Sequence, residues 1–242
     1  MRALVFPLEG PVMALQGSVI DGRPEGVPIP THSMVTGLIA AALGILANDA
    51  ARLQELSDAL EHAVIVRRRG RPIEDFQKAN LRGDAERGVP EQPRLNTTFD
   101  EIGRAVSRPS GSTGALAVQL QRRPWLVDAA FTLVVTGADL DAIQAALLRP
   151  RWPLYLGRTG FLPSRSLAGM IVEGAGLVEI AIAQPGEMAW LPAHYAAPQA
   201  GDVVQMLPGR RDWRTRRHGS ASLWTRLPLA MEQRHEPGST HH

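Results

Sequence analysis

The chain has 242 residues, 44% of them hydrophobic and 21% charged, and its 26 basic residues against 24 acidic ones give a formal charge of +2. These proportions exclude a disordered, fibrous or strongly polycationic protein and fit a globular chain of one elaborated domain or two small ones. The absence of cysteine excludes disulfides, thiol catalysis and cysteine-bound zinc.

The N-terminal half alternates patterns typical of strands with patterns typical of helices. In chain order it predicts a strand at 2–8, a turn at 9–11, a helix at 31–46, a second helix at 50–63 and a strand at 63–68. A loop rich in glycine and proline precedes the first helix, which Thr31 or Ser33 would cap.

The second half begins with a different composition. Residues 76–122 are polar and interrupted by glycine and proline, which predicts an insertion or extended loop that could contain a hairpin. Further elements follow in the order of a strand at 125–137, a helix at 138–150 and a strand-like run at 176–183. This order of elements is compatible with a split βαβ, or ferredoxin-like, arrangement, which is also the scaffold of RNA-recognition modules.

Arginine supplies nearly all of the positive charge, because Lys78 is the only lysine. Arginine makes planar, bidentate contacts with phosphate, so this bias favours nucleic-acid binding, although a GC-rich genome would explain it equally well. The segment RPRWPLYLGRTGFLPSRS at 149–166 combines four arginines with no acidic residue, and its prolines and glycines exclude a regular helix or strand. A loop that presents guanidinium groups and backbone amides to an anion fits both features.

Three other stretches each have a functional and a structural interpretation. Thr31, His32 and Ser33 at a helix N-terminus could hold a phosphate, although a plain helix cap is favoured. Phe76 could stack on a base or pack in a core. The run RRDWRTRR at 210–217 could contact RNA or form a solvated charged face.

No established catalytic or metal-binding pattern is present in the sequence. The histidines are scattered, and no nucleophile elbow, Walker loop or dinucleotide fingerprint follows a predicted strand. Asp139 and Asp141 fit the start of a helix better than a catalytic pair. Since no secretion signal or membrane-spanning run is found, we expect a soluble, cytoplasmic protein that makes no membrane contact.

Taken in order, several segments resemble those of a known family. They are LEGPVMALQG (8–17), IPTHSMVTGLIAAALGI (29–45), IEDFQKAN (73–80), RPWLVDAAFTLVV (123–135) and RPRWPLYLGRTGFLPSRSL (149–167). The chain thereby resembles the CRISPR-associated RAMP proteins, in particular the CasD-type subunits of type I-E Cascade. The LYLGR element at 154–158 is the most specific match.

The resemblance implies an α+β fold and an RNA-binding role. We expect a ferredoxin-like (RRM-type) domain at 1–160, with a β-hairpin thumb inserted at about 78–115, and a small C-terminal β-rich region at 161–242. By analogy, the protein is a non-catalytic subunit that caps the 5′ handle of the CRISPR RNA (crRNA) and joins the backbone and large subunits. It would meet target DNA through the assembled complex and needs no cofactor or metal.

The resemblance also implies which residues lie near the RNA handle. Those expected to contact RNA are Gly10, Gln16, Thr31, His32, Ser33, Gln77, Lys78, Tyr155, Gly157 and Arg158. After LYLGR the chain departs from the family pattern, which places one phosphate contact in doubt, and Arg165 is expected to substitute for it.

Two alternative functions remain open at this stage. A related subunit of another subtype cleaves repeat RNA without metal, which requires a base to activate the 2′-hydroxyl. Gln77 stands where relatives often have histidine, so only His32, Tyr155 and Lys78 are left as candidates for such a metal-independent endoribonuclease. The second alternative is a purely structural assembly subunit whose basic loops bind acidic partner surfaces.

Overall fold

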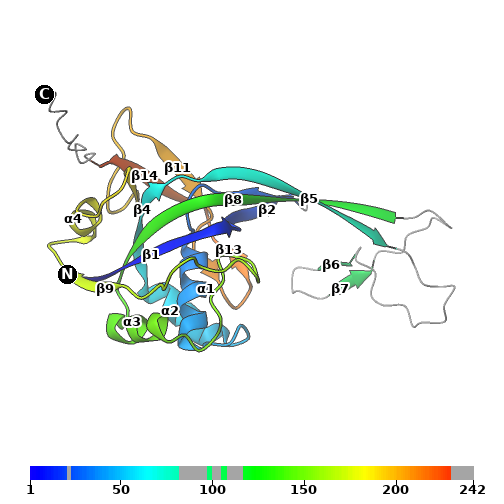
Figure 1. Ribbon diagram of the computed structural model, residues 1–242, viewed down its shortest axis with the longest axis horizontal. Helices are drawn as coiled ribbons and strands as arrows, with labels where there is room; N and C mark the ends of the chain where they lie inside the picture. The colour runs from blue at the N-terminus through cyan, green and yellow to red at the C-terminus, as the bar shows by residue number, and fades with distance from the viewer. Residues whose placement is uncertain (21–22, 82–96, 100–104, 108–116, 230–242) are drawn as a thin grey trace, which may run out of the picture.

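The computed structural model of the protein describes residues 1–20, 23–81, 97–99, 105–107 and 117–229 (Figure 1). The helices in these residues are α1 (His32–Leu43), α2 (Ala50–Ala59), α3 (Leu140–Leu148) and α4 (Leu177–Ile182). The strands are β1 (Arg2–Met13), β2 (Gln16–Ile20), β3 (Arg23–Gly26), β4 (Glu61–Arg68), β5 (Arg71–Leu81), β6 (Thr97–Phe99), β7 (Ala105–Ser107), β8 (Ala117–Thr136), β9 (Met170–Glu173), β10 (Met188–Pro192), β11 (Val204–Leu207), β12 (Arg211–Asp212), β13 (Arg217–His218) and β14 (Ser222–Pro228).

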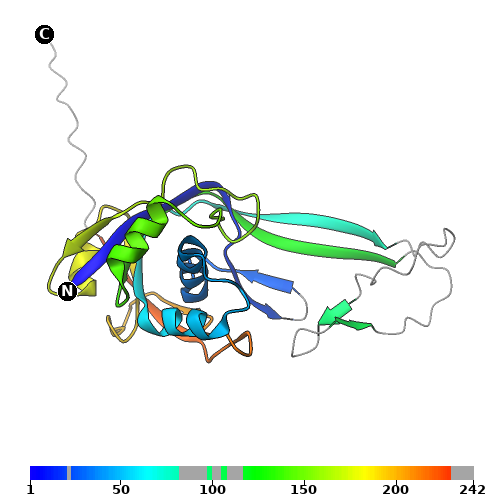
Figure 2. The same cartoon turned by 90° about the horizontal axis from the view of Figure 1, so that it is seen from below.

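Within the described part of the chain, one antiparallel sheet of eight strands organises the molecule. Its order is β11-β14-β10-β4-β8-β1-β9, and β5 joins by pairing with β8. Helices α1, α2 and α3 pack on one face of the sheet, and α4 covers part of the other (Figures 1 and 2). The predicted α+β class is confirmed.

Alternating side chains give the sheet a core on each face. In β8, Phe131, Leu133 and Val135 are fully buried in the core beneath α1–α3, whereas Val134 lies in the smaller core beneath α4. Burial of each such side chain contributes roughly 1.5–3 kcal/mol relative to exposure, so the central strand is strongly fixed in register.

Strands β4 and β5 pair one after the other with β8, and β5 and β8 form a two-stranded ribbon. The pairing of β4 with β8 shifts register between Val66 and Arg68, and nearby in β8 Asp128 adopts a left-handed φ of 57°. Arg68 stabilises this bulge through two contacts with Asp128. Its Nε donates a hydrogen bond to the Asp128 carbonyl at 2.7 Å, and its guanidinium forms an ion pair with the Asp128 carboxylate at 2.8 Å.

Beyond this point the ribbon of β5 and β8 projects away from the body of the sheet (Figure 1). The insertion predicted at about 78–115 lies largely outside the described residues. The structure describes the two arms that lead to it, as far as Leu81 on one side and from Ala117 on the other.

Helices α1, α2 and α3 begin within two residues of where the sequence predicts them. Thr31 is the N-cap of α1, as expected, and Asp139 caps α3 by accepting a hydrogen bond from the Ala142 amide at 3.1 Å. Asp141 in the first turn of α3 pairs with Arg2 at 2.9 Å, so both carboxylates have the structural role that was predicted.

Two predicted elements are wrong. The strand that was expected to end before a turn at 9–11 continues to Met13. Strand β9 pairs only with residues 2–5 of β1, so none of the described strands pairs with this edge of β1 at Pro11. Proline lacks an N–H, and at such an edge position no ladder hydrogen bond is lost. The strand-like run at 176–183 forms α4. Leu177, Ile180 and Ala181 are buried at helical spacing there, in a short apolar run whose periodicity fits either element.

The C-terminal part of the chain extends the same sheet. Strand β10 pairs with β4, and β14 and β11 follow it outward. Among the described residues, none of the helices is long and apolar enough to cross a membrane.

Two neutral histidines lie in the core between α1 and the sheet. His62 is 1% exposed, with its ring centroid 5.5 Å from that of His32 and 5.0 Å from that of Trp224. Burial lowers the pKa of His62 to about 3, and burial followed by the positive charge of Arg210 lowers the pKa of His32 to about 4.

We expect the free energy of unfolding to fall as the pH drops below 6.5, because the unfolded chain binds these protons and the folded chain does not. The expected loss is about 1 kcal/mol per pH unit for each histidine between pH 6.5 and about pH 5. Urea unfolding of the wild type and of His62→Gln over this range measures it. The variant should show about half the slope, and equal slopes would contradict this account.

Candidate nucleic-acid interface

The basic segment at 149–166 forms a loop that lies against the open edge of β1. The Ala14 amide donates to the Leu156 carbonyl at 2.9 Å, and the Ser164 amide donates to the Glu9 carbonyl at 3.0 Å. These bonds fix the loop within LYLGR, at Leu156, and again at Ser164, so Arg158 between them projects from a defined backbone.

Two glycines permit this close approach. Gly157 has a φ of +86°, and a Cβ there would lie 2.1 Å from the Ala14 carbonyl oxygen. On the facing strand, a Cβ at Gly10 would lie 2.5 Å from Leu156 Cδ1 and 2.8 Å from the Leu162 carbonyl oxygen. Both positions therefore require glycine, because neither has room for a Cβ atom. Gly157 also requires it for its left-handed backbone conformation.

Arg158 leaves the loop toward β8. Its guanidinium lies 5.6 Å from the ring centroid of Trp125, which packs edge-on against Phe161 at 5.0 Å. Arg158 Nη1 is buried and has no hydrogen-bond partner among the described residues. The contact with Trp125 holds the guanidinium in position beside the loop.

Glu9 is the acidic centre of the neighbouring surface. It pairs with Arg67 of β4 and lies 3.7 Å from Arg165 of the loop, with its side chain 21% exposed. One carboxylate between two guanidinium groups leaves this part of the open sheet face positive.

The start of α1 meets the same loop around a small cavity of about 30 Å³. Pro30 and Met34 line it from the helix side, and Tyr155 and Gly157 line it from the loop. The structure therefore brings together three segments that are far apart in sequence, at the end of β1, the start of α1 and LYLGR.

The predicted RNA contacts at the start of α1 differ in exposure. Thr31 is 2% exposed, with its hydroxyl 3.2 Å from that of the half-buried Ser33. His32 is 8% exposed, and its Nε2 lies 2.9 Å from the Ser57 carbonyl oxygen. In this conformation Ser33 is therefore the most accessible of the three.

The remaining predicted contacts lie along the strands. Gln16 begins β2 and pairs with Gly26, with a half-buried side chain. Gln77 and Lys78 belong to the β5 arm, where the structure describes the backbone alone. Gln77 and Lys78 therefore lie on the projecting ribbon and not at the loop of residues 149–166.

Phe76 precedes them on the ribbon and is 53% exposed. The Arg122 guanidinium lies 5.4 Å from its ring centroid, and Arg122 also approaches Glu74 at 3.5 Å. Of the two interpretations of Phe76, packing in a core does not describe its position, and an exposed ring beside an arginine can stack on a base.

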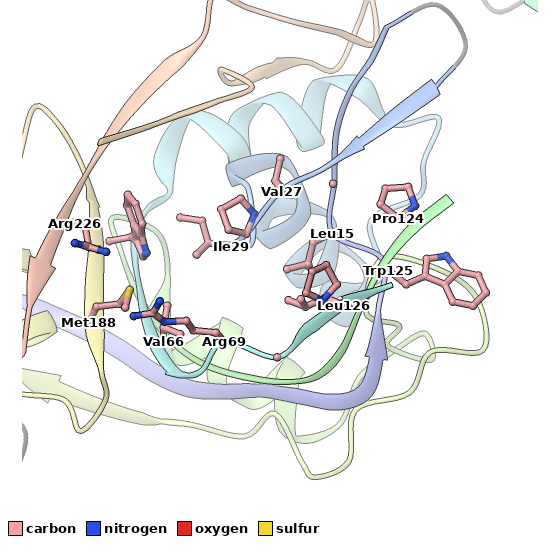
Figure 3. Close-up of a pocket in the computed structure, with 15 residues that line it drawn as sticks. Leu15, Val27, Ile29, Val66, Arg69, Pro124, Trp125, Leu126, Met188 and Arg226 are labelled. Atoms are coloured by element: carbon pink, nitrogen blue, oxygen red, sulfur yellow. The ribbon is translucent and has the colours of Figure 1, made fainter. Parts of the chain in front are cut away.

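A larger pocket of about 470 Å³ opens next to the loop. Its lining is mainly apolar and comprises Leu15, Gly26, Val27, Pro28, Ile29, Val66, Arg69, Gly70, Pro72, Pro124, Trp125, Leu126, Met188, Trp190 and Arg226. Arg69 and Arg226 lie toward one end, and Pro124 and Trp125 lie at the other (Figure 3). A flat, apolar ring with an attached anion fits such a lining.

Sequence reasoning missed this pocket and the role of Trp125, which lines it and also stacks under Arg158. The lining comes from several separate segments, so no local motif marks it. Among the described residues, no cluster of three or more His, Asp or Glu side chains could hold a metal ion.

Comparison with known proteins adds an independent observation. A family model described as CRISPR-associated protein (Cas_Cas5) matches residues 3–223. The chain is 30% identical over 161 residues to the CRISPR system Cascade subunit CasD of Escherichia coli (strain K12), an alignment that covers 64% of each chain and so spans just under two thirds of that relative's length.

Solved structures of similar fold are also known. A chain of a CRISPR RNA-guided surveillance complex matches with a TM-score of 0.60 at 25% identity, covering 94% of this chain and 90% of that one. A crystal structure of a Cas protein matches with a TM-score of 0.59 at 24% identity over 94% of both chains, which shows a shared fold.

The two loop glycines make a matched test of how the loop is seated. Both have positive φ, but a Cβ at Gly160 would have no atom within 4 Å, whereas one at Gly157 would meet the Ala14 carbonyl. We expect Gly160→Ala to lower the free energy of unfolding by about 1–2 kcal/mol, and Gly157→Ala to lower it by clearly more. Urea unfolding measures both, and equal losses would show that the loop does not depend on this approach.

Proposed function

The chain belongs to the family of CRISPR-associated proteins (Cas_Cas5), and from this membership we propose that it is a non-catalytic, RNA-binding subunit of a type I-E surveillance complex, Cascade. In this role it caps the 5′ handle of the crRNA and joins the backbone and large subunits. Target DNA reaches it through the assembled complex.

The observation that carries the proposal is the seating of the LYLGR loop against the end of β1 and the start of α1. Segments on which the resemblance rests converge there, and Arg158 and Arg165 rise from the fixed backbone. Guanidinium groups on a glycine-rich loop suit the sugar-phosphate of a single strand that lies close to the backbone.

The apolar pocket beside this loop extends the proposed RNA surface. Trp125 joins the two, because it lines the pocket and stacks under Arg158. A base splayed out of the RNA strand would enter the pocket while its phosphate meets an arginine at the rim.

The projecting ribbon leads to the proposed thumb, the insertion at about 78–115. The ribbon continues the central strands β4 and β8 and carries Gln77 and Lys78, so the domain at 1–160 would grip RNA with both its loop and its ribbon. The region from 161 onward is the proposed smaller C-terminal part, whose strands lengthen the sheet beyond β4.

The state of His32 supports a non-catalytic role over repeat-RNA cleavage. A general base must reach the proton that it removes. The imidazole of His32 is buried and held by Ser57, and its pKa is lowered to about 4. Lys78 lies on the ribbon, away from Tyr155 in the loop, and His32 next to the loop is held by Ser57, so the three candidates for catalysis do not form one site.

Binding of an end-labelled repeat RNA in the presence of EDTA tests the proposal, read on native and denaturing gels. We expect a shifted and intact RNA whose binding is lost when the handle sequence is scrambled. A discrete cleavage product would contradict the non-catalytic assignment.

Arg158→Ala should weaken this binding about tenfold and reduce the slope of log affinity against log salt by about one unit, as for one lost phosphate contact. Arg52→Ala, which removes an exposed arginine from α2, is the matched control and should leave both quantities unchanged. Equal behaviour of the two variants would remove Arg158 from the RNA site.

A further inference from the structure

A second basic surface lies far from the loop. Residues 210–218 contain five arginines and one acidic residue, and they form the hairpin of β12 and β13. This hairpin lies beside α2, on the other side of α1 from the loop at 154–166 (Figure 2). The proposed handle site therefore does not account for it.

The first arginine of the hairpin is used to anchor it. Arg210 donates to the Ser57 and Leu60 carbonyls at 2.8 and 3.2 Å, at the C-terminal end of α2, and it pairs with Glu61. The Trp213 amide donates to Gln54 Oε1 at 3.0 Å. The hairpin is thus fixed to the body of the protein at its base and near its tip.

The tip of the hairpin is held in one conformation. Asp212 Oδ1 accepts hydrogen bonds from the amides of Arg214 and Thr215 at 2.8 and 3.1 Å, so the acidic residue closes the turn. Arg216 adopts a left-handed φ of 60°, which is costly for a residue with a long side chain. The ordered turn therefore fixes the backbone from which the arginines of the tip project.

The exposed side chains of the tip carry charge without apolar surface. Arg214, Arg216 and Arg217 are exposed, whereas Trp213 is half-buried against the main core. Arg211 covers the Trp213 ring at 5.0 Å. Burial, and then the charge of Arg216, lower the pKa of Arg211, which is consistent with a positive potential across the hairpin.

This combination selects among possible partners. A protein partner generally needs an apolar or aromatic anchor, and a single-strand binder needs an exposed ring on which bases stack. The tip offers neither as a free anchor, because its half-buried tryptophan packs on the main core and has Arg211 over its ring. Guanidinium groups alone match the phosphate backbone of a duplex, where contacts carry no sequence information.

We propose that the β12–β13 hairpin is a sequence-independent binding site for the phosphate backbone of double-stranded nucleic acid. The site is separate from the handle surface, so it can be occupied while an RNA is bound at the loop.

Fluorescence anisotropy of the full chain with a labelled duplex of about 24 base pairs, measured from about 25 to about 200 mM salt, tests this proposal. The variant is Arg214→Gln combined with Arg216→Asn, since asparagine tolerates the left-handed conformation at 216. Arg2→Gln combined with Arg52→Gln is the matched control, because it removes two exposed arginines that lie outside the hairpin and outside the loop at 149–166. Thermal unfolding establishes that each variant remains folded.

We expect the hairpin variant to lose at least tenfold in duplex affinity at low salt and to show a salt slope shallower by about two units. The control should match the wild type, and repeat-RNA handle binding should persist in both variants. Duplex DNA and duplex RNA of one length distinguish the source of the phosphates. An equal loss in the control, no loss in the hairpin variant, or a greater loss with single-stranded DNA would overturn the proposal.

Discussion

The structure depends on the pairing of one long strand with three partners. β8 pairs with β1 on one side, and on the other it pairs first with β4 and then with β5. Its buried half, which includes Phe131 and Leu133, is fixed by two hydrophobic cores, and its other half forms an arm of the projecting ribbon. The ribbon is therefore continuous with the fully buried central part of the sheet, and the bulge at Arg68 and Asp128 lies where the ribbon begins.

The candidate RNA surface is built largely by backbone approach. Gly10 and Gly157 allow the loop to lie against β1 at distances that a side chain would prevent, and the arginines then project from a seated loop. Pre-organisation of this kind lowers the entropy lost on binding, which would suit the proposed binding of a flexible RNA strand. The hairpin of β12 and β13 follows the same principle, since Asp212 orders its turn and Arg210 anchors its base.

Much of the fold is visible in the sequence because it follows local rules. The starts of α1 and α3 have capping residues and were predicted within two residues, and the apolar run of β8 was predicted as a strand that ends one residue from the observed end. The start of β8 at Ala117 was missed, because its first residues lie in the polar segment at 76–122 that was predicted to be an insertion or extended loop. The run at 176–183 was misread because six apolar residues fit a strand and a helix equally well. The first strand was predicted to end before Pro11. The sequence does not show that β9 pairs with only residues 2–5 of β1 and that no described strand pairs with that edge at Pro11.

The site was predictable only in part. The segment LYLGR identified the loop, but the stacking of Arg158 on Trp125 and the apolar pocket arise from residues distant in sequence.

The most direct test of the account is photo-crosslinking of crRNA that carries thiouridine in its 5′ handle, with the bound peptides identified by mass spectrometry after complex assembly. We predict crosslinks in residues 8–17 and 154–166 of this chain. Crosslinks confined to α2, α3 or other subunits would contradict the central claim that the seated loop holds the handle.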